Sequence, residues 1–150
     1  MNWPRSTFLP LAALLGTLLA QPATTKETVR FQAVDIFIDS KETPLAAYQL
    51  ELSVKGGDAK IVGVEGGEHP AFKEAPFYDP KAIQQERVIV AAFNTASADK
   101  LPKGKTRVAT IHFQVSGERN PDYAIKLETA ATREGRKIVV ETTHEERKPE

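Results

Sequence analysis

Apolar and polar residues alternate along most of the chain, which is the pattern of half-buried β-strands. Residues 45–54, for example, place Tyr48, Leu50 and Leu52 on one face and polar side chains on the other, and residues 106–116 follow the same rule. Turn-forming residues separate such segments at short intervals, and no heptad or long helical period is present. The pattern predicts an all-β fold, an antiparallel β-sandwich of about eight to nine strands.

Two segments depart from simple alternation. Residues 29–33 alternate in one phase and residues 34–39 in the opposite phase, which predicts a bulge or a strand that passes between sheets. Residues 87–95 are apolar on both faces, which predicts a central strand. The apolar faces together give a predicted core of Phe31, Leu50, Leu52, Val64, Val90, Ile111, Phe113 and Val115.

Residues 1–20 have the features of a secretory signal peptide. They combine a single basic side chain, Arg5, with an uncharged apolar run from Phe8 to Ala20. That run is short for a helix that must cross a hydrocarbon core of about 30 Å. We therefore expect cleavage near Ala20, a secreted or periplasmic protein, and no integral membrane segment after cleavage.

The rest of the chain is expected to form one domain. Residues 21–28 make a polar lead-in, residues 29–143 the sandwich, and residues 144–150 a charged flexible tail. The last strand is expected over residues 137–143, after a hairpin loop.

Charge and cysteine content exclude several classes of function. The whole chain has 20 basic and 20 acidic side chains, so loss of Arg5 with the leader leaves a formal net charge of −1. This balance argues against nucleic acid or an anionic membrane as the main partner, because both require a concentrated basic field. The absence of cysteine excludes disulfides, thiolate metal sites and a cysteine nucleophile, a composition that fits a bacterial exported protein.

Three segments in order resemble the cohesin pattern. LAAYQLELSV over residues 45–54 precedes a Gly-rich turn, KIVGVEGG follows over residues 60–67, and KTRVATIHFQV comes after Gly104. The similarity covers about residues 29–127. It implies a jelly-roll sandwich that binds a dockerin partner or, in related modules, a polysaccharide surface.

Several histidines and carboxylates have two possible interpretations, as ligands of a metal site or as ordinary surface residues. His69 lies beside Glu68 in a loop, but no second histidine lies at ligand spacing, so a solvated loop residue is the preferred interpretation. His112 is expected at the surface of its strand. Asp35 and Asp39 could contribute to calcium binding, but no loop supplies the other oxygens that calcium requires, so surface charge is preferred.

The long loop over residues 68–85 holds the candidate contact residues. Phe72, Phe77 and Tyr78 lie there among prolines and charges. Loops of this length in a compact domain are commonly functional or disordered. The rings could contact a sugar or a partner protein, or they could cap an open end of the core.

No nucleophile–base pair, phosphate loop or cofactor motif is visible, so we predict a non-catalytic binding module with no cofactor and no metal. A protein partner, dockerin-like or another exported protein, is favoured over polysaccharide, because the one tryptophan, Trp3, lies in the leader. Two alternatives remain open. One is a carbohydrate-binding module linked to polysaccharide breakdown, and the other is a small hydrolase using a carboxylate pair such as Glu65 and Glu68.

Overall fold

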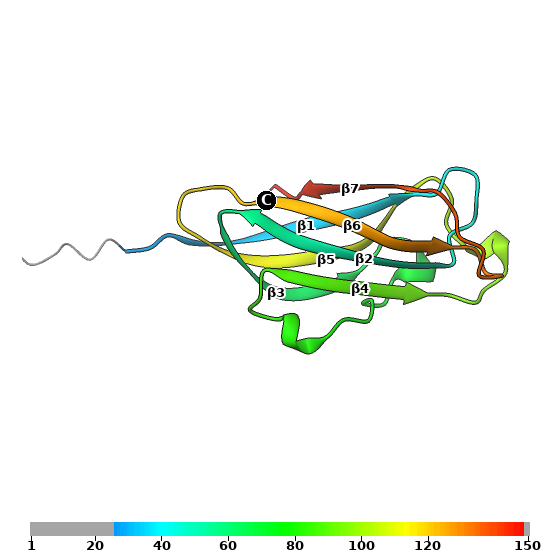
Figure 1. Cartoon of the computed structure of the whole chain (residues 1–150), viewed down its shortest axis with the longest axis horizontal. Helices are drawn as coiled ribbons and strands as arrows, with labels where there is room; N and C mark the ends of the chain where they lie inside the picture. The colour runs from blue at the N-terminus through cyan, green and yellow to red at the C-terminus, as the bar shows by residue number, and fades with distance from the viewer. Residues whose placement is uncertain (1–25, 149–150) are drawn as a thin grey trace, which may run out of the picture.

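A computed structural model describes residues 26–148, so the predicted leader lies outside the described residues. This part of the chain forms two antiparallel sheets whose strands run along the long axis of the molecule (Figure 1). Sheet A has the order β3-β5-β1-β7 and sheet B the order β4-β2-β6. The seven strands are β1 (Val29–Asp39), β2 (Ala47–Gly56), β3 (Asp58–Gly66), β4 (Arg87–Phe93), β5 (Lys105–Ser116), β6 (Asp122–Ala131) and β7 (Glu141–Glu146).

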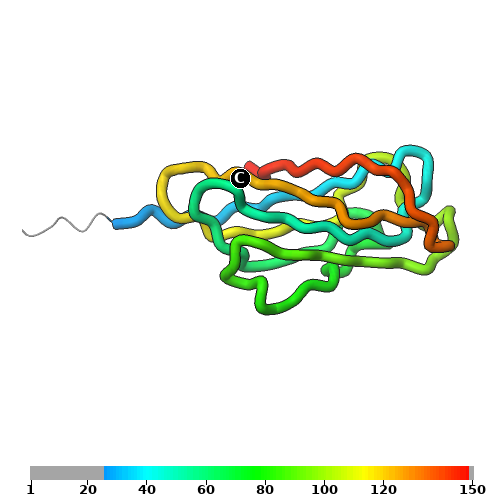
Figure 2. Tube along the Cα trace, viewed as in Figure 1, coloured from blue at the N-terminus to red at the C-terminus, as the bar shows by residue number. Residues whose placement is uncertain are grey.

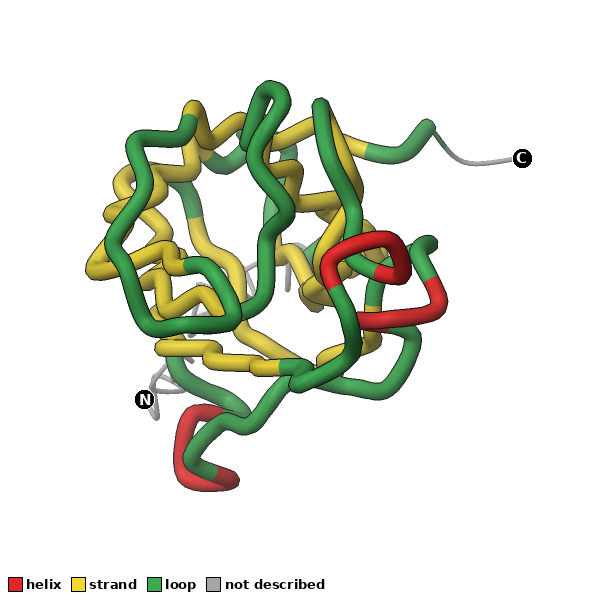
Figure 3. Tube along the Cα trace, turned by 90° about the vertical axis from the view of Figure 1, so that its right-hand side faces the viewer, coloured by secondary structure: helices red, strands yellow, loops and turns green. Residues whose placement is uncertain are grey.

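Connections between the strands are loops with short 3-10 turns. These are η1 (Pro70–Phe72), η2 (Pro80–Ala82) and η3 (Ala98–Lys100). Figure 3, a view along the long axis, draws these turns as short red segments within the green loops, and the loops can be followed along the trace in Figure 2. Turns η1 and η2 lie between β3 of sheet A and β4 of sheet B, and η3 lies between β4 and β5 of sheet A. No helix among residues 26–148 combines the length and apolar character needed to cross a membrane.

One hydrophobic core lies between the two sheets. Leu50 and Leu52 from sheet B and Ile111 and Phe113 from sheet A have no exposed surface. The Phe113 ring lies 4.8 Å from the Tyr123 ring, centroid to centroid, across the interior. Full burial of such side chains stabilises the fold by roughly 1.5–3 kcal/mol each. Alternate positions on both sheets therefore hold the layers together, as the alternation in the sequence predicted.

The predicted core is confirmed at six of its eight positions, which are fully buried: Leu50, Leu52, Val90, Ile111, Phe113 and Val115. Val64 packs against the core but is only partly buried. The prediction for Phe31 is wrong, because 71% of its surface is exposed.

The change of hydrophobic phase in residues 29–39 marks the end of the core. These residues form the single strand β1, whose inward positions begin with the polar Arg30 and Gln32. The hydroxyl of Tyr123 donates a hydrogen bond of 3.1 Å to the side-chain oxygen of Gln32. The predicted bulge is therefore absent at the phase change, and the register shift with β5 lies further along, between Ile36 and Phe37. The total of seven strands in the described residues is below the eight to nine predicted.

Strand β4 is an edge strand and not the central strand predicted. It is the last strand in the order β4-β2-β6, and on its other side an isolated bridge joins Ala91 to Phe77 of the preceding loop. Val88 and Val90 point into the core, whereas Ile89 and Phe93 lie on the outer face with 39% and 66% of their surface exposed. The second apolar face of this segment therefore belongs to the molecular surface.

The flexible tail predicted over residues 144–150 overlaps the end of β7, which runs to Glu146. His144 and its neighbours form β7, which pairs with β1 from Val34 to Asp39. Residues 137–140, predicted as strand, instead approach β6 through an isolated bridge between Ala131 and Lys137. Charged residues form a strand here because β1 offers a free edge that needs backbone partners.

The two phenylalanines at positions 113 and 31 give a matched test of the core. We expect Phe113→Ala to destabilise the fold by about 3–5 kcal/mol, because it leaves a cavity between the sheets. Phe31→Ala should stay within about 0.5 kcal/mol of the parent, because the ring is exposed. Urea unfolding of both variants measures the difference, and equal effects would contradict the assignment of the two faces.

Candidate functional site

The loop between β3 and β4 runs beside β4 and begins at two glycines that allow a close backbone approach (Figure 1). A Cβ at Gly66 would collide with the carbonyl oxygen of Lys73, and one at Gly67 with that of Arg107. Only glycine permits this approach. The Gly67 N–H then donates a hydrogen bond of 2.7 Å to the Phe72 carbonyl, which folds the loop back on β3.

The predicted contact residue Phe72 is not available to a partner. Only 2% of its surface is exposed. Its ring meets that of Tyr48 edge to face, with the centroids 5.4 Å apart. For this residue the alternative interpretation, a ring that caps the core, is the correct one. Tyr78 is partly buried and also packs against the core.

Phe77 has the opposite environment, with 72% of its surface exposed. Its position is nevertheless fixed by the backbone. Its N–H donates to the Ala91 carbonyl at 2.8 Å, and the Ala91 N–H donates back at 3.0 Å. Directly opposed residues share a face of the sheet, so the Phe77 ring lies on the outer face of sheet B.

Phe77, Phe93 and Ile89 form an exposed apolar surface, here called the aromatic platform. The rings of Phe77 and Phe93 are stacked, with centroids 6.2 Å apart and planes inclined by 15°. Their neighbours on β2 and β4 are small, because Phe93 pairs with Ala47 and Phe77 with Ala91. The rings therefore have small neighbours at these two positions, and Gln49 and Glu51 of β2 lie beside Ala91 and Ile89 on the same face.

A groove of about 300 Å³ lies beside the platform. Phe77 and Phe93 line it together with the buried Phe72, and Asn94 lies in its wall. The Asn94 amide donates a hydrogen bond of 3.0 Å to the Ala71 carbonyl, which ties this wall to η1. The rings of Phe77 and Phe93 and the groove beside them thus form one continuous surface, supported by backbone that is hydrogen-bonded to β4.

Charged pairs border the platform. The Arg87 guanidinium lies 2.7 Å from the Glu51 carboxylate on the neighbouring strand. The hydrogen bond from Arg87 lowers the pKa of Glu51, which keeps this carboxylate ionised at neutral pH. On β6, Lys126 pairs with Glu128 at 2.8 Å. Such exposed pairs add little stability but fix the charges around an apolar centre.

Sequence reasoning missed Phe93 and Ile89. Their signal was present, because residues 87–95 are apolar on both faces. An apolar second face has two explanations, a central strand or an exposed binding surface. The order of strands in the sheet decides between these two explanations, and hydrophobic alternation in the sequence does not reveal that order.

The histidines have local roles. His69 Nδ1 accepts a hydrogen bond of 3.1 Å from the Ala71 N–H and so caps η1. His112 Nε2 lies 3.2 Å from the Glu65 carboxylate, at an angle that makes no hydrogen bond.

Glu65 and Glu68, weighed as a hydrolytic pair, have separate partners. Glu65 faces His112, whereas Glu68 Oε1 accepts the backbone N–H of Arg107 at 2.9 Å. Within residues 26–148 no three His, Cys, Asp or Glu side chains gather in a way that could hold a metal ion. Asp39 is engaged by the backbone N–H and the amine of Lys41, each at 2.9 Å.

Asp35 is the centre of a charged network on the outer face of sheet A. Its Oδ1 accepts hydrogen bonds of 2.6 Å from the Thr110 hydroxyl and from Arg147. Arg107 donates to the Thr110 hydroxyl oxygen at 2.8 Å. Partial burial acts to raise the pKa of Asp35, but the bonds from Thr110 and Arg147 and the two arginine charges outweigh burial and lower that pKa.

The lowered pKa makes the stability contributed by Asp35 depend on pH. The contribution is fully present above the unfolded value of about 3.9 and is lost as pH falls through the lower folded value. We expect Asp35→Asn to destabilise the fold by about 1–3 kcal/mol at pH 7. In urea unfolding at pH 3 and below, its difference from the parent should shrink. The exposed control Asp99→Asn should change stability by less than about 0.5 kcal/mol. A deficit for Asp35→Asn that does not change with pH would contradict this role.

The aromatic platform is the surface of the described chain best suited to contact another molecule. It offers apolar area, a fixed backbone and a charged border in one place. Comparison of the chain with models of protein families, with curated proteins and with solved structures found no match.

Proposed function

We propose that this chain is an exported, non-catalytic module that binds a protein partner through the aromatic platform of sheet B. The partner presents an apolar strip flanked by charged side chains, as an amphipathic helix does. The leader in residues 1–20 supports the export, and the cohesin resemblance of residues 29–127 supports both a jelly-roll sandwich and a protein partner.

The observation that carries the proposal is the exposure of two stacked rings on a rigid strand pair. Phe77 and Phe93 are 72% and 66% exposed, and Ile89 beside them is 39% exposed. A phenylalanine buries roughly 150–250 Å² when it is covered, so two adjacent rings offer a large apolar gain on binding. Aromatic residues surrounded by a polar rim are typical of the energetic centre of a protein interface.

The chemistry of the platform favours protein over polysaccharide. Phe77, Phe93 and Ile89 themselves carry no side-chain hydrogen-bonding group, and the polar side chains beside them on β2 are Gln49, which pairs with Ala91, and Glu51, which Arg87 binds. Sugar recognition requires polar groups that bond the hydroxyls as well as a ring to stack on. The pair formed by Arg87 and Glu51 at the border suits the charged flank of an amphipathic segment.

A variant pair tests the platform. Phe77→Ala/Phe93→Ala should weaken partner binding at least about 30-fold, because each ring acts as an interface anchor. The matched control is Val139→Ala, which truncates an apolar side chain exposed by 95% outside the platform and should bind as the parent does.

The parent, the platform variant and the control are each immobilised and used to capture exported proteins, and the captured partner is then titrated against all three. Insoluble cellulose, chitin and xylan are assayed in parallel. Equal capture by the three proteins would show that the platform does not bind the partner. Retention on a polysaccharide that depends on Phe77 and Phe93, with no protein captured, would establish a carbohydrate-binding module instead.

A further inference from the structure

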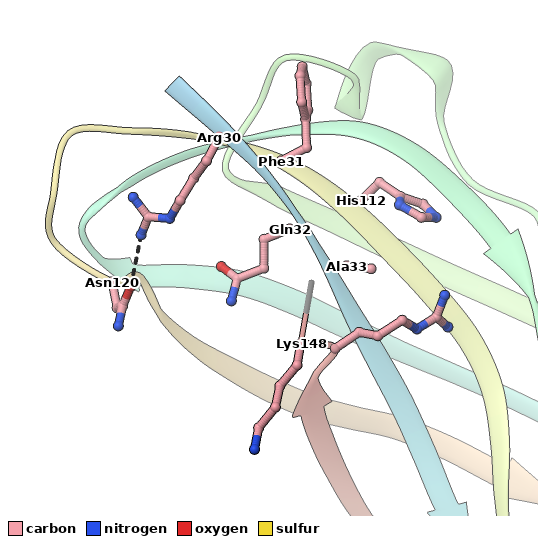
Figure 4. Close-up of a pocket in the computed structure, with 8 residues that line it drawn as sticks. Arg30, Phe31, Gln32, Ala33, His112, Asn120 and Lys148 are labelled. Atoms are coloured by element: carbon pink, nitrogen blue, oxygen red, sulfur yellow. Dashed lines mark hydrogen bonds between the residues drawn. The ribbon is translucent and has the colours of Figure 1, made fainter. Parts of the chain in front are cut away.

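Strand β1 continues past the end of its neighbour β7. The ladder between them runs from Asp39 to Val34, and the final bond joins the Arg147 N–H to the Ala33 carbonyl at 2.8 Å. Figure 4 shows β7 ending near Lys148 while β1 continues to Phe31 and Arg30. The first part of β1 therefore has β5 on one side and no paired strand on the other among residues 26–148.

The backbone of this segment is oriented for pairing. In an antiparallel strand, successive residues direct their N–H and C=O groups to opposite sides. The Thr28 carbonyl accepts from Gly117 on the side of β5, whereas the Ala33 carbonyl accepts from Arg147 on the side of β7. Phe31 is two residues from Ala33, so its N–H and C=O point to the same side as those of Ala33, beyond the end of β7.

On this side of β1, the last backbone bond among residues 26–148 is the one from Arg147 to Ala33. The Phe31 N–H and C=O therefore have no strand beside them there within the described part of the chain. An added strand would complete this side of the ladder.

The cavity at this edge has a volume of about 620 Å³ and is basic. Its lining holds three basic side chains, Arg30, Arg147 and Lys148, and no carboxylate, and Glu146 lies at its border, where its Oε2 accepts a hydrogen bond of 2.6 Å from the lining residue Gln32. Arg147 is bonded to Asp35, but Arg30 is held by neutral oxygens. Its guanidinium donates to the Gly117 carbonyl at 2.6 Å and the Arg119 carbonyl at 3.2 Å. It also donates to Asn120 Oδ1 at 2.8 Å, the bond drawn in Figure 4.

We propose that the Val29–Ala33 part of β1 binds an extended acidic peptide of another protein as an added strand, antiparallel to β1. Main-chain bonds to Phe31 provide the pairing, as in other cases of strand addition. The peptide residue opposite Phe31 is apolar, and its side chain lies over the exposed Phe31 ring. The two peptide residues next to it are acidic, and their side chains point to the other face of the sheet, on which Arg30 lies.

A second copy of this chain is a poorer occupant. Pairing two β1 edges would bring Arg30 and Lys148 of one copy against the same residues of the other, and like charges in contact oppose association. An acidic peptide complements both charges. This site is separate from the aromatic platform, which lies on sheet B, and does not depend on the proposed function.

The test uses a labelled eight-residue peptide of alternating Glu and Val, titrated with the exported protein by fluorescence anisotropy. Two methylated forms separate strand addition from charge attraction. Methylation of the Val nitrogens removes the donors that face β1 and should weaken binding about tenfold or more. Methylation of the Glu nitrogens leaves those donors intact and should have little effect.

Protein variants locate the site. Arg30→Gln should weaken binding about five- to tenfold, and Lys148→Gln, at an exposed position, about two- to fivefold with a smaller salt dependence. A thermal melt checks that Arg30→Gln still folds. Phe77→Ala/Phe93→Ala should bind the peptide as the parent does, which separates this site from the platform.

Three results would overturn the proposal. The first is no binding of the Glu–Val peptide, and the second is equal binding of a Lys–Val peptide. The third is equal binding of both methylated forms together with binding of polygalacturonate, which would show a general anion site and not strand addition.

Discussion

The antiparallel ladder between β1 and β5 is the constraint on which the rest of the structure depends. The two strands are neighbours along the whole of Val29–Asp39. Inward side chains such as Ile36 and Phe113 are completely buried between the sheets. Because side chains alternate with a period of two, this register also fixes which residues face outward. A shift by one residue would expose the core and bury the Asp35 network.

Both proposed contact surfaces lie where strand pairing stops. Sheet B ends at β4, which carries the aromatic platform on its outer face. In sheet A, β7 ends before β1 does, so within residues 26–148 the backbone of Phe31 has β5 on one side and no paired strand on the other. Unpaired edges and exposed apolar rings favour association, and proteins usually shield them with charge. The pair formed by Arg87 and Glu51 at one surface and the guanidinium of Arg30 at the other limit what can dock there.

Alternation predicted the two-sheet fold and six core residues, because burial on one face of a strand leaves a local record in the sequence. It failed at Phe31, where the apolar phase of residues 29–33 belongs to the outer face. The loop over residues 68–85 grouped the exposed Phe77 with the buried Phe72 and the partly buried Tyr78. A ring in a long loop carries no sequence signal that separates capping of the core from exposure.

The sequence by itself determined which residues share a face, where turns interrupt the strands and that cysteine chemistry is absent. Only the tertiary structure decided which strands stand at the edges. It made β4 an edge whose second apolar face is exposed, and it placed His144 in a strand instead of a tail. The physical reason is that strand order arises from pairing between segments far apart in the chain, whereas alternation records only the local contrast between two faces.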